Sequence, residues 1–127
     1  MATRPTFTSG DVFTAVNANI LATSIVALVT QSGTAVTAAL TDVGKLINFT
    51  SGTAVAFTIP ANATVAFSVG DQINIYQAGT ATVTITPAAT VTVRSSGSKL
   101  KTNDQFSVAT CIKIDTNEWI AIGNLKA

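Results

Sequence analysis

The sequence contains no histidine and one cysteine, Cys111, among its 127 residues. Without histidine, Ser-His-Asp and Cys-His catalytic units cannot form, and the common zinc sites lose their usual ligands. A single cysteine excludes a disulfide within the chain. Its place in an apolar, strand-like run predicts a small buried side chain rather than a reactive thiol. We therefore expect no enzymatic activity, no cofactor and no metal.

Charge is also scarce. Charged residues make up 10% of the sequence, against roughly 25% in ordinary globular proteins. The net charge is +1, and the basic residues are scattered rather than gathered in a run with aromatic residues, so we expect no nucleic-acid binding. So few charges would poorly solubilise an isolated monomer. This predicts that much of the surface is buried in an assembly.

Long hydrophobic runs are missing too. The longest apolar stretch, from Ile20 to Val29, is interrupted by Thr23 and Ser24 and is too short to span a bilayer. The first residues lack the charged and then apolar pattern of a secretory signal. We expect a protein without a membrane partner that is made in a cytoplasm.

What the sequence does contain is a period of two. Isoleucine and valine alternate with polar residues in several short segments, at Ile73/Ile75, Val83/Ile85, Val91/Val93 and Ile112/Ile114. Such alternation predicts half-buried β-strands with one set of side chains in a core and the other on a surface. For the last segment it places Ile112 and Ile114 toward the core and Lys113 toward solvent.

Turn signals recur at the spacing of an all-β domain, and a repeat of fixed period is not evident. We predict strands over residues 35–40, 46–50, 54–59, 72–77, 81–86, 90–94, 106–114 and 119–122. The expected fold is mainly β, an antiparallel β-sandwich or small barrel formed by residues 34–127. Residues 1–33 are expected to form an extended N-terminal docking arm with a short helix over residues 15–21, capped by Thr14.

Few side chains suggest a site. The acids lie in or beside predicted turns, where aspartate usually accepts hydrogen bonds from nearby backbone amides. The run Thr82, Thr84 and Thr86 matches an ice-binding array but is better explained as the solvent face of a strand. Trp119 is expected to close one end of the core rather than to stack on a sugar. A weak basic cluster, Arg94, Lys99 and Lys101, is interpreted as solvated or subunit-facing.

Two parts of the chain resemble proteins of tailed bacteriophage particles. Residues 5–17, PTFTSGDVFTAVN, are similar to a leader found on small phage virion proteins, from which Phe13 and Val16 depart mildly. The body resembles a β-rich module of phage tail fibres and capsid-decorating proteins. This resemblance includes residues 42–46, 58–62, 67–73, 97–101, 106–110, 112–114 and 117–119.

The resemblance implies a non-enzymatic structural protein of the virion. One arm and one module favour a capsid decoration or cement protein on the capsid exterior, which bridges major capsid protein subunits through many weak contacts. A homo-oligomer, with a trimer favoured, would bury the Thr- and Val-rich faces. The alternatives are a receptor-binding tail-fibre or tail-knob module and, more distantly, a stand-alone carbohydrate- or ice-binding domain. If the protein is a cement protein, the arm is expected to dock on the major capsid protein through Arg4, Pro5, Phe7, Val12 and Phe13.

Overall fold

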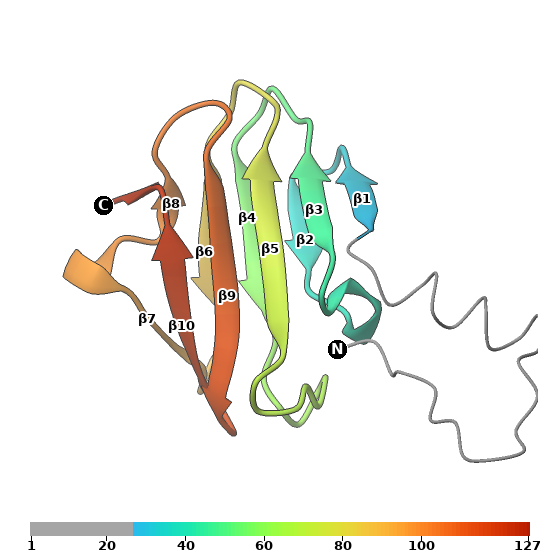
Figure 1. The fold of residues 1–127 in the computed structure, drawn as a ribbon, viewed down its shortest axis with the longest axis vertical. Helices are drawn as coiled ribbons and strands as arrows, with labels where there is room; N and C mark the ends of the chain where they lie inside the picture. The colour runs from blue at the N-terminus through green and yellow to red at the C-terminus, as the bar shows by residue number, and fades with distance from the viewer. Residues whose placement is uncertain (1–26) are drawn as a thin grey trace, which may run out of the picture.

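The computed structural model describes residues 27–127 and is mainly β in that range (Figure 1). The eight predicted strands are confirmed with small shifts of their ends. Three short strands, β1, β8 and β11, were not predicted, and β1 lies N-terminal to the expected start of the β body at residue 34. The strands are β1 (Leu28–Gln31), β2 (Ala35–Thr37), β3 (Leu46–Phe49), β4 (Val55–Ile59), β5 (Gln72–Gln77), β6 (Val83–Pro87), β7 (Thr92–Arg94), β8 (Lys101–Thr102), β9 (Val108–Asp115), β10 (Glu118–Gly123) and β11 (Leu125–Lys126).

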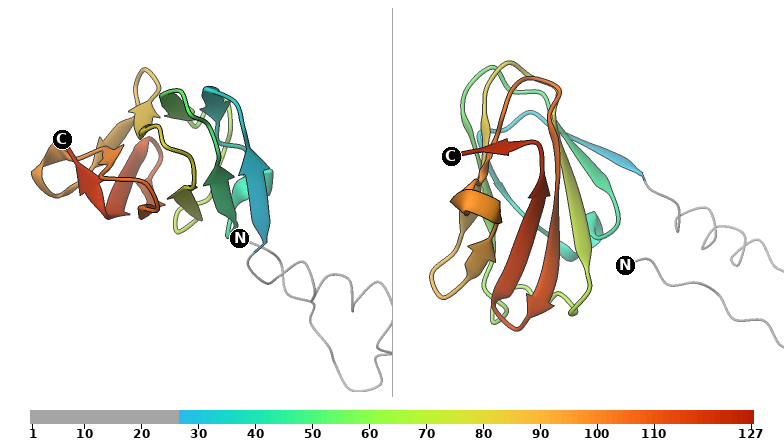
Figure 2. Two further views of the ribbon diagram at one scale, coloured as in Figure 1. Left: turned by 90° about the horizontal axis from the view of Figure 1, so that it is seen from above. Right: turned by 60° about the vertical axis from the view of Figure 1, so that its left-hand side comes forward.

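These strands form two sheets that face each other (Figure 2). The six-stranded sheet has the order β1-β3-β5-β9-β10-β7, and the five-stranded sheet has the order β11-β8-β6-β4-β2. Two short 3-10 turns, η1 (Leu40–Asp42) and η2 (Ser96–Ser98), lie in the connections. From β1 to β6 the chain crosses to the opposite sheet after every strand.

The expected antiparallel pairing is wrong for most strand pairs. Five pairs are parallel, β1–β3, β3–β5, β2–β4, β4–β6 and β7–β10, and four are antiparallel, β5–β9, β9–β10, β6–β8 and β8–β11. A parallel pair requires a long connection between its strands. Here the strand in the opposite sheet supplies that connection, so β1 to β6 form a coil of three turns.

The turns of this coil differ in length, which explains why no fixed repeat is visible in the sequence. Leu28 pairs with Leu46, 18 positions on, whereas Leu46 pairs with Asn74, 28 positions on. Successive turns nevertheless stack closely. A Cβ atom at Gly79 would lie 2.2 Å from the Ser51 carbonyl oxygen, so this contact between neighbouring turns requires glycine.

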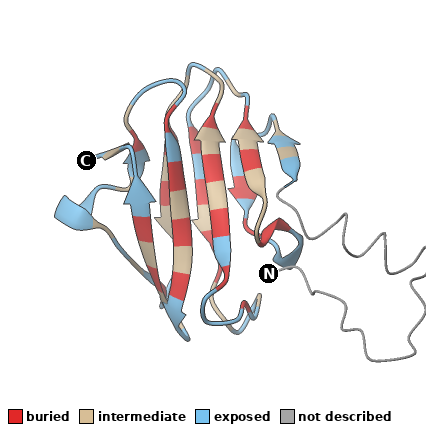
Figure 3. Cartoon of the chain, viewed as in Figure 1, coloured by how far each residue is buried: buried red, intermediate tan, exposed pale blue. Residues whose placement is uncertain are grey.

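The hydrophobic core lies between the two sheets (Figure 3). Phe49 of β3 meets Phe57 of β4 edge to face, with ring centroids 5.6 Å apart, an arrangement that aromatic pairs favour. Both rings are buried, as are Ile73 and Ile75 of β5. At the other end, Trp119 packs edge to face on Phe67 at 5.2 Å. The expectation that Trp119 closes one end of the core is confirmed.

The predicted orientation of β9 is wrong. Lys113 is 2% exposed and faces inward, whereas Ile114 is 42% exposed and faces outward. The register with β5 explains the reversal, because Ile73 pairs with Cys111 and directly opposed residues share a face. Once Ile73 is in the core, Cys111 and Lys113 must follow it inward, and the isoleucines on either side of Lys113 must point to the surface.

Candidate docking surface

The outer face of β9 and β10 is unusually apolar. Antiparallel strands with one solvated face normally carry polar residues there. Here the outward positions include five aliphatic side chains, which we call the aliphatic face: Val108, Ile112, Ile114, Ile120 and Ile122. Ile112 and Ile120 are direct cross-strand partners, so the two rows are contiguous. A contiguous exposed apolar patch of this kind marks an interaction surface.

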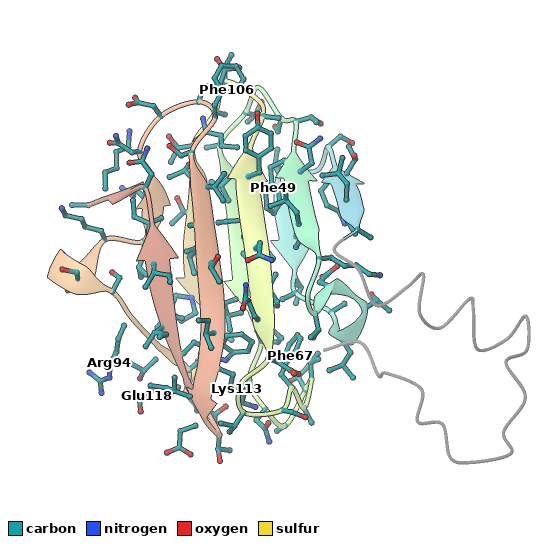
Figure 4. The ribbon with its side chains drawn as sticks, viewed as in Figure 1. Phe49, Phe67, Arg94, Phe106, Lys113 and Glu118 are labelled. Atoms are coloured by element: carbon teal, nitrogen blue, oxygen red, sulfur yellow. The ribbon has the colours of Figure 1, made fainter. Side chains whose placement is uncertain are left out.

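Polar side chains border the aliphatic face on the β5 side. The Asn74 Oδ1 atom accepts hydrogen bonds from Thr110 Oγ1 at 2.8 Å and from Gln72 Nε2 at 2.9 Å. On the β7 side, the Arg94 guanidinium forms an ion pair with the Glu118 carboxylate (Figure 4). An apolar centre with a polar border is the usual anatomy of a protein–protein interface.

An aromatic pair lies at the β5 edge of this surface. Phe106 is 64% exposed and has a φ of 71°, a left-handed conformation that is costly for a non-glycine residue. Its ring stacks on Tyr76 with centroids 6.5 Å apart and planes inclined by 26°. An exposed phenylalanine held against a tyrosine offers a flat face for an apolar or sugar ring.

The three residues of the predicted basic cluster lie on neighbouring parts of the chain's surface. Lys99 lines a pocket of about 320 Å³ together with Ser95, Ile122 and Leu125. Arg94 is ion-paired on β7, and Lys101 lies on β8 in the five-stranded sheet. Arg94 lines an adjoining pocket that shares Ser95 and Ile122 with the pocket at Lys99.

The threonine run belongs to a larger ladder on the outer face of the five-stranded sheet. The parallel register aligns Thr37 of β2, Thr58 of β4 and Thr86 of β6, and it aligns Ala35, Ala56 and Thr84 beside them. Sequence reasoning missed this alignment because the residues are unevenly spaced along the chain. The signal that could have revealed it is the Ala-x-Thr or Thr-x-Thr pattern shared by the three strands.

Other predicted residues are found as follows. The docking residues Arg4, Pro5, Phe7, Val12 and Phe13 and the predicted short helix lie outside the described residues. Three of the turn acids accept backbone hydrogen bonds as expected, whereas Asp104 accepts one from the Asn103 side chain and Glu118 is ion-paired. The Asp42 carboxylate accepts from Ala39, Asp71 from Ser68 and Asp115 from Thr116, at 2.7–2.9 Å between nitrogen and oxygen. The aliphatic face itself was missed, because Ile112 and Ile114 were assigned to the core and the strand over residues 119–122 was given no orientation.

Cys111 is fully buried, as predicted, and burial raises the pKa of its thiol to about 12. Because the thiolate is the reactive form, we expect a maleimide at pH 8 to modify the native protein far more slowly than the protein in denaturant. The unfolded thiol has a pKa near 8.5, so the unfolded state releases its proton first. The thiol therefore lowers the free energy of unfolding as the pH rises from about 8.5 toward 12. Equal modification rates in native buffer and in denaturant would contradict this burial.

No protein-family model, curated protein or solved structure matches this chain. Within residues 27–127 there is no helix with the length and hydropathy that crossing a bilayer requires. The same residues contain no group of three or more histidine, cysteine, aspartate or glutamate side chains that could hold a metal ion.

Proposed function

We propose that this protein is a non-enzymatic structural component of a bacteriophage particle, most specifically a decoration or cement protein that stabilises the capsid. The observation that carries the proposal is the aliphatic face, with Ile114 and Ile122 42% and 53% exposed on rigid paired strands. A surface built this way serves binding rather than catalysis. The resemblance of residues 5–17 to a phage virion leader supplies the particle context.

We assign the aliphatic face to contacts between copies of the chain. Permanent interfaces between identical subunits are more apolar than transient ones, and the five aliphatic side chains suit that class. Each subunit then contributes its own arm toward the major capsid protein, with Arg4, Pro5, Phe7, Val12 and Phe13 as the docking residues. Several weak arm contacts on one oligomer would act together by multivalency. A trimer on a local three-fold axis of the shell satisfies this arrangement.

The proposal is tested by removing the protein from the particle. A cement stabilises the assembled shell because it binds the shell in preference to separated subunits. Particles that lack the protein should therefore release their DNA at a lower temperature than complete particles, and adding the purified protein back should restore the difference. Adsorption to host cells should stay normal.

A receptor-binding tail module is the second candidate, and the exposed Tyr76–Phe106 pair favours it because aromatic faces can stack on sugar rings. The same particles distinguish the two functions. If particles without the protein adsorb poorly but keep their thermal stability, the tail function replaces the capsid function. A Phe106→Ala variant should then reproduce the adsorption defect, whereas in a cement protein it should leave adsorption unchanged.

A further inference from the structure

A buried lysine amine lies against an asparagine amide at one end of the core. Lys113 is 2% exposed. Its Nζ atom donates hydrogen bonds to the Asn62 Oδ1 atom at 2.5 Å and to the Phe67 carbonyl oxygen at 2.7 Å. Figure 4 shows Lys113 and Phe67 together at this end of the six-stranded sheet. Burying an ammonium group is costly even when it is hydrogen-bonded, so this lysine needs an explanation.

A carboxylic acid lies directly across the strand pair from Lys113. The Lys113 amide donates to the Asp71 carbonyl oxygen at 3.0 Å, and the Gly70 amide donates to the Lys113 carbonyl oxygen at 2.8 Å. With Gly70 at a φ of 94°, this is the pattern of a G1 β-bulge, in which two residues oppose one. Asp71 is 8% exposed. Asp71 lies two positions before Ile73, whose side chain faces the core. Because side chains two positions apart on a strand point to the same face, the Asp71 carboxyl lies on the same face as the Lys113 side chain.

Aromatic rings shield this group from water. Trp119 is the cross-strand partner of Lys113 on β10, and Phe67 packs on Trp119. Both rings are less than 5% exposed. On the remaining side the Asn62 backbone is held by a hydrogen bond from its amide to the Asn117 Oδ1 atom at 2.9 Å. The amine and the amide are thus held in contact in a largely dry site, and the Asp71 carboxyl, which accepts a hydrogen bond from the Ser68 amide, lies on the same face of the adjacent strand.

We propose that Lys113 and Asn62 form an intramolecular isopeptide bond, with Asp71 as the proton carrier. A desolvated lysine amine is an effective nucleophile. The Asn62 Cγ atom is one bond from Oδ1, so a small rotation of the amide brings it to the separation of about 3–3.5 Å from which attack occurs.

In the reaction, Nζ gives a proton to the Asp71 carboxylate and attacks Cγ, forming the new C–N bond. The bond from Cγ to the amide nitrogen then breaks. The Asp71 proton passes to that nitrogen, which leaves as ammonia. The second proton that Nζ loses on becoming an amide passes through Asp71 to this ammonia. The lysine ammonium and the asparagine amide thus become a neutral secondary amide plus ammonium, and no oxidant or other reactant is needed.

Two consequences explain why such a bond would suit this chain. It converts a buried ammonium into a neutral amide, which removes the cost of burying the charge. It also joins residues 51 positions apart and so constrains the unfolded chain as a disulfide does. A protein with a single cysteine has no disulfide within the chain to do this.

Intact-mass spectrometry of the purified full chain tests the proposal, after folding and prolonged incubation at neutral pH. The expected mass is the sequence mass less one ammonia. Trypsin should fail to cut at Lys113 and should release residues 46–94 covalently joined to residues 102–126. A measured mass equal to the full sequence mass would overturn the proposal and leave Lys113 as a structural ammonium. A mass short by ammonia without the joined peptide would also overturn it, because a cyclised asparagine loses the same mass.

Variants assign the roles. Lys113→Arg and Asn62→Ala should each retain the full mass, and Asn62→Asp should lose water in place of ammonia. Asp71→Asn should slow or stop the mass loss while circular dichroism shows the native β signal. If a folded Asp71→Asn variant loses mass at the same rate as the original protein, Asp71 takes no part in the reaction. Asn62 lies at a partly exposed loop position, so the Asn62→Ala variant serves as the folded control if Lys113→Arg does not fold.

Discussion

Replacing both Ile114 and Ile122 with lysine is expected to dissociate the oligomer while leaving the subunit folded. Both side chains are about half exposed, and exposed substitutions usually change stability by less than about 0.5 kcal/mol. Loss of a central interface anchor costs about 2 kcal/mol or more, which is at least ~30-fold in affinity for each residue. Like charges brought together across a symmetric interface weaken it further. Sedimentation velocity across a concentration series measures the effect.

The matched control places the same charges on the opposite sheet. Ala35 and Ala56 are exposed and neighbour each other on β2 and β4, so an Ala35→Lys, Ala56→Lys variant carries two extra lysines on the threonine ladder. This control should associate like the original protein. If it dissociates and the isoleucine variant does not, the interface between copies is the threonine-rich face. If the unmodified protein is a monomer both in solution and on particles, the assignment of the aliphatic face to self-association fails.

Replacing Trp119 with alanine is expected to produce the largest loss of stability of any single substitution at the core end. The side chain is 1% exposed and packs on Phe67, so its removal leaves a cavity that rigid strands cannot close. Large-to-small changes of this kind cost about 3–5 kcal/mol. For a domain near this size that lowers Tm by about 15 °C or more.

Thermal and urea unfolding followed by circular dichroism check this value. Phe106→Ala is the matched control, because it removes an aromatic ring that is mostly exposed, and its effect on the free energy of unfolding should be within about 0.5 kcal/mol. A loss below about 1 kcal/mol for Trp119→Ala would show that the ring does not close the core. Since Trp119 also shields Lys113, the variant should in addition form any Lys113–Asn62 bond more slowly.

The local features of this chain could be predicted well. Strand formation depends on alternation and turn residues close in sequence, so β5 was predicted at residues 72–77, where the structure has it. Asp42, Asp71 and Asp115 accept hydrogen bonds from backbone amides close in sequence, as expected for the same reason. Short strands such as β8 and β11, with two residues each, carry too little pattern to be detected. Most of the candidate surface could not be found, since it depends on which face of β9 turns outward.

The sequence by itself determined that the chain is β-rich, where its main strands lie, and that Cys111 and Trp119 are buried. Only the tertiary structure decided how the strands pair and which side of β9 is in the core. Alternation identifies two faces, but a one-residue change of register exchanges them. The pairing of Ile73 with Cys111 decides between them through residues 38 positions apart. The parallel coil is likewise a property of distant segments, because its unequal turns leave no period along the chain.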